Sequence, residues 1–192
     1  MTASSTSTII RLGRGPSGAS KVTVERAGVY DERFIRKLLR WNLLLVCSGN
    51  TCRSAMAEAL AKQILAEQRG LQIDELASAG LRVVSAGVYA AEGAKASPEA
   101  VEAMSALGLD LRQHRSRRLA HEMIHEADVI YCMTAGHVQA VQAMVPLAAD
   151  HISPLDPNLD VADPIGSNAN GYRRCAELIR RRLDQRLKEQ QL

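Results

Sequence analysis

The residues best suited to chemistry lie in one short segment. Cys47 stands six positions before Arg53, and small or polar residues separate them: Ser48, Gly49, Asn50, Thr51 and Cys52. A loop of this kind can surround a tetrahedral oxyanion with backbone amides, while the arginine adds a full positive charge. A positive field favours the thiolate form of a cysteine. We therefore expect Cys47 to be a nucleophile in phosphate chemistry, residues 48–52 and Ser54 to bind the phosphate, and Ser54 to donate to the thiolate.

The flanking segments must present this loop to its ligand. An apolar run at 41–46 leads into the loop, and a helix-forming run at 54–69 leads out of it. The pattern predicts a buried strand followed by a helix whose N-terminus faces the loop and adds partial positive charge.

Short β-rich runs alternate with longer helical runs from Trp41 onward. This alternation predicts an α/β fold, a doubly wound four-stranded parallel sheet with helices on both faces. We expect strands at 41–46, 83–86, 129–133 and 151–153, and helices at 54–69, 98–107, 119–127, 137–144 and 171–190. Ligands of such sheets bind beyond the carboxyl ends of the strands, where the loop at Cys47 lies.

Composition limits the class of protein. The chain has 192 residues, of which 46% are hydrophobic and 3% aromatic, and a net charge of +3, which fits an aliphatic α/β domain with an extension. It has neither a secretory signal nor an apolar run of about 18 residues, so we expect a cytoplasmic protein with no membrane partner. The basic residues of the last helical segment alternate with acids, which predicts a solvated face and no nucleic-acid partner.

The segment from Cys47 to Ser54 resembles the signature of the low-molecular-weight protein phosphatase family: a cysteine, five residues, an arginine and a serine. Further segments follow the order of the family: Met56-Ala57-Glu58-Ala59, Ser85-Ala86-Gly87, His114-Arg115-Ser116, Asp128 and Asp163-Pro164. The resemblance covers about residues 41–190. It implies a metal-independent enzyme without cofactors that dephosphorylates proteins through a phosphocysteine at Cys47, with Arg53 holding phosphoryl oxygens.

The resemblance also implies that an aspartate in a loop protonates the leaving group and then activates the hydrolytic water. Two Asp-Pro pairs could supply it, Asp156-Pro157 and Asp163-Pro164. Asp163 has the better context, because a glycine and the final helix follow it. We therefore predict Asp163 as the general acid and base.

The substrate is predicted from two departures from the tyrosine-specific members. Those members usually carry a bulky aliphatic residue at the position of Thr51 and aromatic residues after the Asp-Pro pair. Here the pair is followed by Ile165-Gly166. Both departures resemble the branch that acts on protein phosphoarginine, so we expect an arginine phosphatase, with a protein-tyrosine phosphatase as the alternative.

Other interpretations compete with this one. A thioredoxin-linked arsenate reductase shares the loop but needs two further cysteines after the third strand, where Cys132 lies out of register. A non-catalytic phospho-binding module would not need Asp163. The His121-Glu122-Met123-Ile124-His125 sequence fits a zinc-protease pattern, but we expect a solvent-facing histidine pair and no metal site.

The four cysteines are expected to be reduced thiols. Cys52 could form a reversible disulfide with Cys47 or be a small packed side chain. Cys132 and Cys175 are predicted to be core residues.

Residues 1–40 do not follow the alternation. They predict a strand at 7–12, a turn at 13–18, a strand at 22–25 and a helix at 32–39, which cannot bury a core alone. Ser7-Thr8-Ile9-Ile10 and Val24-Glu25-Arg26-Ala27-Gly28 resemble the carboxyl-terminal end of a threonylcarbamoyl-adenylate synthase domain. We therefore predict an N-terminal extension at 1–40, either a remnant of a fused domain or loosely docked, and a phosphatase domain at 41–192. A covalent or functional link to a synthase domain is implied.

Overall fold

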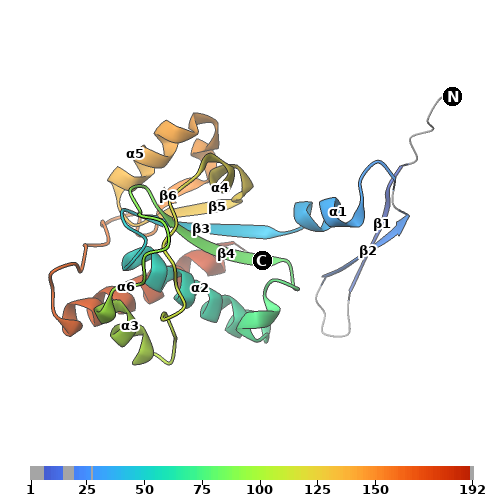
Figure 1. Ribbon diagram of the computed structural model, residues 1–192. Helices are drawn as coiled ribbons and strands as arrows, with labels where there is room; N and C mark the ends of the chain where they lie inside the picture. The colour runs from blue at the N-terminus through green and yellow to red at the C-terminus, as the bar shows by residue number, and fades with distance from the viewer. Residues whose placement is uncertain (1–6, 15–19, 27, 191–192) are drawn as a thin grey trace.

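A parallel sheet forms the centre of the computed structural model, which describes residues 7–14, 20–26 and 28–190 (Figure 1). Its four strands lie in the order β4-β3-β5-β6. They are β3 (Trp41–Cys47), β4 (Leu81–Gly87), β5 (Val129–Cys132) and β6 (Ile152–Pro154). The predicted doubly wound α/β fold is therefore confirmed.

Helices cover both faces of this sheet (Figure 1). One face carries α2 (Arg53–Arg69), α3 (Pro98–Ser105) and α6 (Ala169–Glu189); the other carries α4 (His121–Glu126) and α5 (Ala135–Met144). Successive side chains of β3 enter opposite layers: Leu43 and Leu45 pack with α2 and α6, whereas Leu44 and Val46 pack with α4 and α5. Burial on both sides explains why this strand is apolar without alternation.

Several element ends differ from the sequence prediction. The helices α5 and α6 each begin two residues earlier than predicted, because Thr134 and Asn168 cap them by accepting the N–H groups of His137 and Gly171. The helix α4 is shorter than predicted, since the backbone is extended on both sides of it. Two short 3-10 helices, Ile73–Glu75 and Pro146–His151, were not predicted.

Strand register brings the candidate loop against Gly87. Cys47 pairs with Gly87 across β3 and β4. A Cβ atom on Gly87 would lie 2.5 Å from the carbonyl oxygen of Ser48 and 2.9 Å from the backbone nitrogen of Asn50. Only glycine lets the two backbones approach this closely.

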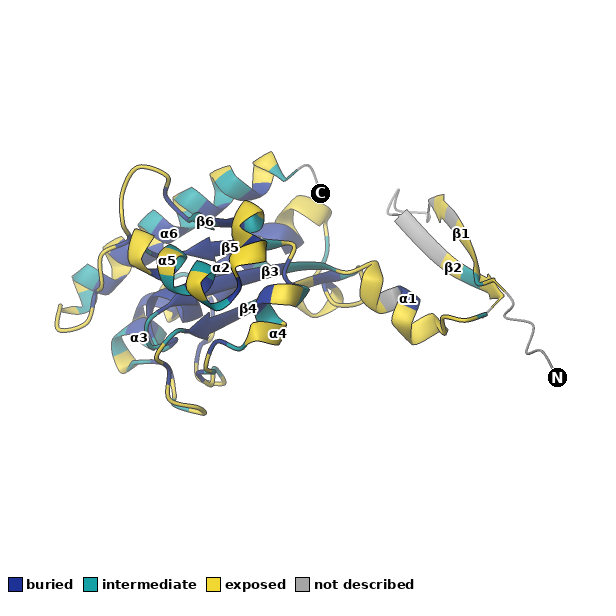
Figure 2. Ribbon diagram, turned by 90° about the horizontal axis from the view of Figure 1, so that it is seen from above, coloured by how far each residue is buried: buried dark blue, intermediate teal, exposed yellow. Residues whose placement is uncertain are grey.

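The hairpin of the N-terminal segment stands apart from the sheet and its helices (Figure 2), whereas the helix that follows it is ion-paired with α4 through Lys37 and Glu126 at 2.6 Å. An antiparallel hairpin of β1 (Ile9–Arg14) and β2 (Ser20–Arg26) precedes α1 (Glu32–Leu38). The predicted strands and helix are present with shifted ends, and most of the predicted 13–18 turn lies outside the described residues. Tyr30 stacks on Phe34 with ring centroids 4.7 Å apart, and both remain exposed. None of the helices in the described part of the chain could cross a membrane.

Candidate active site

The loop at 47–53, hereafter the cysteine loop, joins the end of β3 to the start of α2. Cys47 is only 2% exposed, and its Sγ accepts the backbone N–H of Asn50 at 3.3 Å. The Oγ of Ser54 lies 2.9 Å from the same sulfur. Asn50 has a φ of 55°, a left-handed conformation that asparagine tolerates better than most residues. The turn at Asn50 curls the loop around the sulfur.

A buried chain of hydrogen bonds fixes Asn50. Its Nδ2 donates to the hydroxyls of Ser54 at 2.9 Å and Ser85 at 2.8 Å. Ser85 donates in turn to Glu58 at 2.6 Å, and Lys62 pairs with Glu58 at 2.5 Å. Burial acts to raise the pKa of Glu58, but the charge and hydrogen bond of Lys62 outweigh it, so the pKa is lowered. An ionised carboxylate therefore anchors the network.

Glu58 and Ser85 belong to segments that follow the family order, but no role for either was predicted from the sequence. Each is a polar residue in an otherwise apolar helix face or strand. Because buried polar groups need partners, this pattern could have indicated that the two residues bond to other polar groups.

The segment after α3 holds the other side of Asn50. The backbone N–H of Arg117 donates to Asn50 Oδ1 at 2.9 Å, and His114 Nε2 lies 2.7 Å from the Asn50 carbonyl oxygen. Every polar atom of the Asn50 amide therefore has a partner, and the left-handed turn is held from two directions.

A second histidine supports Ser48. His137 lies 2.9 Å from Ser48 Oγ through Nε2 and 2.8 Å from Thr134 Oγ1 through Nδ1. Burial, followed by the charge of Arg53, lowers the pKa of His137, although Asp160 and Asp163 act in the opposite direction. The neutral imidazole is favoured, and this residue was not predicted from the sequence.

Arg53 and Asp163 lie together at the mouth of the loop. Arg53 is buried and donates to the Val161 carbonyl at 3.0 Å, and its guanidinium is ion-paired with Asp163. Asp156 does not reach this place, because it is buried beneath α6 and paired with Arg182 at 2.7 Å. The structure thus brings Asp163, and not Asp156, to the cysteine loop.

A cavity of about 220 Å³ opens over Cys47. The cysteine loop forms its floor, and Tyr89, Asp163 and Ile165 form its walls. Tyr89 is 76% exposed and was not predicted from the sequence. The cavity is also lined by Ser48, Gly49 and Thr51, which the sequence predicts to bind phosphate.

The structure gives the remaining cysteines distinct surroundings. All four are free thiols, and Cys52 lies 3.3 Å from Ser97 Oγ and 3.6 Å from the Tyr172 hydroxyl. Cys132 and Cys175 are buried, as predicted, and burial raises the pKa of each to about 12. Thiols held in the protonated form are poor members of a redox relay.

The zinc-protease pattern does not form a site. His121, Glu122 and His125 are exposed on α4, as expected of a solvent-facing pair. No group of three or more potential metal ligands occurs among residues 7–14, 20–26 and 28–190.

The chain is similar in sequence to known protein phosphatases. The family model described as low molecular weight phosphotyrosine protein phosphatase matches residues 42–192. The protein-arginine-phosphatase of Bacillus subtilis is 35% identical over 153 residues, 77% of this chain and 95% of its own length. The probable low molecular weight protein-tyrosine-phosphatase EpsP of Ralstonia nicotianae is 33% identical over 144 residues, 74% of this chain and 90% of its own length.

A solved structure shows the same architecture. It is a mutant of the YwlE arginine phosphatase with a phosphorylated active-site serine, with 35% identity and a TM-score of 0.69, covering 77% of this chain and 94% of its own. The chain belongs to the low-molecular-weight phosphotyrosine protein phosphatase family. It is a cysteine-dependent protein phosphatase, and its substrates are phosphorylated proteins.

Proposed function

We propose that this enzyme is a protein-arginine phosphatase. The observation that carries the proposal is Thr51, whose short polar side chain lines the cavity over Cys47. A hydroxyl at this wall can accept an N–H of a planar guanidinium, whereas a bulky aliphatic residue would favour an aromatic ring. The resemblance to the Bacillus subtilis protein-arginine-phosphatase supports the same substrate.

The loop geometry supports the following first step. The Cys47 thiolate attacks phosphorus, and the P–N bond breaks as its electron pair returns to the guanidine nitrogen. Asp163 gives that nitrogen its proton, and arginine leaves. The Arg53 fork and the amides of residues 48–52 hold the phosphoryl oxygens, where negative charge develops. In the free enzyme Asp163 is the ionised partner of Arg53. When Arg53 binds the phosphoryl oxygens, this ion pair is released, and Asp163 can take up the proton that it gives to the leaving nitrogen.

The second step hydrolyses the phosphocysteine. Asp163, now a carboxylate, takes a proton from water as the water oxygen bonds to phosphorus. The S–P bond breaks, and the electron pair returns to Cys47 as a thiolate. Ser54 stabilises this leaving group by donating a hydrogen bond to the sulfur. Orthophosphate is released, and no cofactor is needed.

A protein-tyrosine phosphatase is the second candidate, because one observation favours it. Tyr89 stands exposed on the wall of the cavity and offers an aromatic surface to a phosphotyrosine ring. Ile165 of the Asp-Pro loop lines the same cavity, and it supplies no second aromatic face.

Rates on matched peptides test the proposal. Two peptides of identical sequence carry phosphoarginine or phosphotyrosine at one position, and phosphate release gives kcat/KM for each. We expect a ratio of about tenfold or more in favour of phosphoarginine, on the scale that one pocket residue can discriminate. A higher value for phosphotyrosine would assign the enzyme to the other class. Cys47→Ser is the control, and it should release no phosphate from either peptide.

We further propose that residues 41–192 are the catalytic domain of a cytoplasmic enzyme with no nucleic-acid or membrane partner. Residues 1–40 form an extension that belongs with a threonylcarbamoyl-adenylate synthase domain, fused or separate. The family match beginning at residue 42 supports this boundary. Limited proteolysis tests it: cleavage before residue 41 should leave a resistant fragment with full phosphatase activity.

A further inference from the structure

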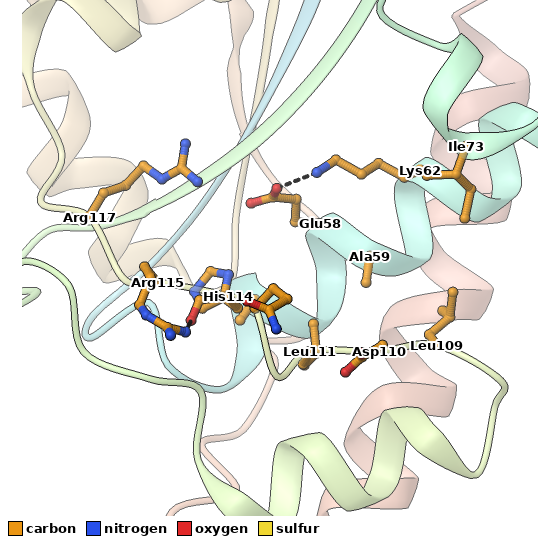
Figure 3. Close-up of a pocket in the computed structure, with 12 residues that line it drawn as sticks. Glu58, Ala59, Lys62, Ile73, Leu109, Asp110, Leu111, His114, Arg115 and Arg117 are labelled. Atoms are coloured by element: carbon orange, nitrogen blue, oxygen red, sulfur yellow. Dashed lines mark hydrogen bonds and ion pairs between the residues drawn. The ribbon is translucent and has the colours of Figure 1, made fainter.

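A second cavity, of about 420 Å³, lies between α2, Ile73 and the segment at 109–117 (Figure 3). It shares no lining residue with the cavity over Cys47. Its lining combines apolar side chains, among them Ala59, Ile73 and Leu111, with charged ones, and Lys62 and Asp110 lie next to the apolar group (Figure 3). Cavities of this size commonly hold small organic ligands.

The charged groups of this cavity are unequally engaged. Glu58 is paired with Lys62 and accepts from Ser85, and Asp110 is paired with Arg112 at 2.9 Å. Both carboxylates are therefore satisfied. Arg115 donates to the backbone carbonyls of Arg112 and His114.

Arg117 differs from these groups. Its guanidinium makes no hydrogen bond or ion pair with any residue that the structure describes, and its charge acts only through space on Glu58. Figure 3 shows Arg117 and Lys62 approaching Glu58 from opposite sides. A half-buried guanidinium without a bonded partner among the described residues can receive an anion.

We propose that this cavity binds a carboxylate attached to a compact apolar body, with Arg117 as the group that recognises the carboxylate. The planar fork of arginine matches a carboxylate in a bidentate manner. A monoanion suits the site better than a dianionic phosphate, because Glu58 and Asp110 already contribute two negative charges against three basic side chains. The apolar body would lie against Ala59, Ile73 and Leu111.

Binding of a ligand in this cavity should affect the surroundings of Cys47. Arg117 and His114 both line the cavity, and they also hold Asn50, through a backbone N–H and an imidazole ring respectively. Asn50 in turn holds Ser54 beside Cys47. Linkage requires that phosphate in the cysteine loop and a carboxylate at Arg117 change one another's affinity by the same factor.

Calorimetric titration of the full chain tests the site with three probes. Hexanoate represents a free acid, acetyl-Ala-Leu represents a peptide C-terminus, and hexanamide is the uncharged control. We expect at least one acid to bind with a Kd on the order of 1 mM, and hexanamide to bind at least about tenfold more weakly. Binding of one acid alone identifies the source of the ligand. Equal binding of hexanamide, or binding of neither acid, would overturn the proposal.

Three variants test whether the acid binds in this cavity. Arg117→Met should weaken acid binding about tenfold or more, because a charge-assisted hydrogen bond is lost. Arg118→Met removes a neighbouring charge outside the cavity and should change the Kd less than twofold. Ala59→Leu fills the apolar wall and should abolish binding while basal phosphatase activity persists. Unchanged thermal unfolding of each variant shows that it is folded, and equal effects of the two arginine changes would contradict the site.

Inorganic phosphate tests the coupling and distinguishes the two cavities. Saturating phosphate should change the Kd of the acid about fivefold and to a constant value, a usual size for coupling between sites. A Kd that keeps rising in proportion to phosphate concentration would indicate competition in the cysteine loop and overturn the assignment. An unchanged Kd would overturn the coupling through Asn50. These readouts do not depend on which phosphorylated residue the enzyme hydrolyses.

Discussion

The sulfur of Cys47 and the hydroxyl oxygen of Ser54 lie 2.9 Å apart across the closed end of the cysteine loop. Ser54 also accepts a hydrogen bond from Asn50 Nδ2. The Ser54 proton has two acceptors within reach, the sulfur at 2.9 Å and the Ala86 carbonyl oxygen at 3.5 Å, and the shorter contact favours the sulfur. A chain of hydrogen bonds thus runs from the Asn50 amide through the Ser54 hydroxyl to the sulfur of the proposed nucleophile.

Removal of that donor should slow turnover. Ser54→Ala deletes a hydrogen bond to a charged sulfur, so we expect kcat to fall about tenfold to a hundredfold. Steady-state rates on a phosphorylated peptide measure the loss. Ser48→Ala is the matched control, since the Ser48 hydroxyl bonds His137 and not Cys47. A larger loss in the control would remove Ser54 from the role of leaving-group donor.

The two Asp-Pro aspartates should separate into a catalytic and a structural residue. Asp163→Asn should lower kcat by about two to four orders of magnitude, because an amide cannot transfer the proton. Asp156→Asn breaks the buried pair with Arg182 and should lower the free energy of unfolding by about 1–3 kcal/mol with kcat retained. Urea unfolding and phosphate release measured on both variants check the division. The reverse pattern would reassign the acid to Asp156.

Thr51→Ile should change substrate preference. The added aliphatic bulk removes a hydroxyl and narrows the cavity, so kcat/KM for phosphoarginine should fall while that for phosphotyrosine rises, an overall shift of about tenfold or more. The matched peptide pair gives both rates. Thr23→Ile places the same change on an exposed strand of the N-terminal extension and should leave the ratio unaltered. An unaltered ratio in Thr51→Ile as well would remove the basis for arginine specificity.

Asn50 should show separate backbone and side-chain effects. Asn50→Gly and Asn50→Ala both delete the amide contacts, but only alanine is strained at a φ of 55°. The alanine variant should therefore be less stable than the glycine variant by about 1–2 kcal/mol in urea unfolding. Equal stabilities would show that the left-handed turn is not maintained in the variants.

His137 should make stability depend on pH. Because burial lowers its pKa in the folded state, the unfolded chain binds more protons once the pH falls below about 6.5. The folded state therefore loses stability as the pH falls through that value and keeps it above. His137→Gln removes this titration, so its unfolding free energy should fall less than that of the wild type between pH 7.5 and 5.5. Parallel curves would contradict the assignment.

The alternation of short apolar runs with longer helical runs was enough to predict the parallel sheet. Each strand of such a sheet is buried on both faces, so burial is recorded in the local sequence. The start of α3 at Pro98 was predicted correctly, and the signal there is local, because Ser97 caps the helix and Pro98 occupies its first turn. The caps at Thr134 and Asn168 were equally local and were overlooked.

The sequence alone determined the class of chemistry, since a cysteine, a short polar loop and an arginine fix which groups can surround a phosphate. Only the tertiary structure shows that Asp163 lies beside Arg53 while Asp156 pairs with Arg182. It also joins Glu58 and Ser85 to Asn50 and sets Tyr89 and His137 beside the loop. These contacts join residues from different strands and helices, and strand register with helix packing decides which distant side chains meet. Such distances are not encoded in any single stretch of sequence.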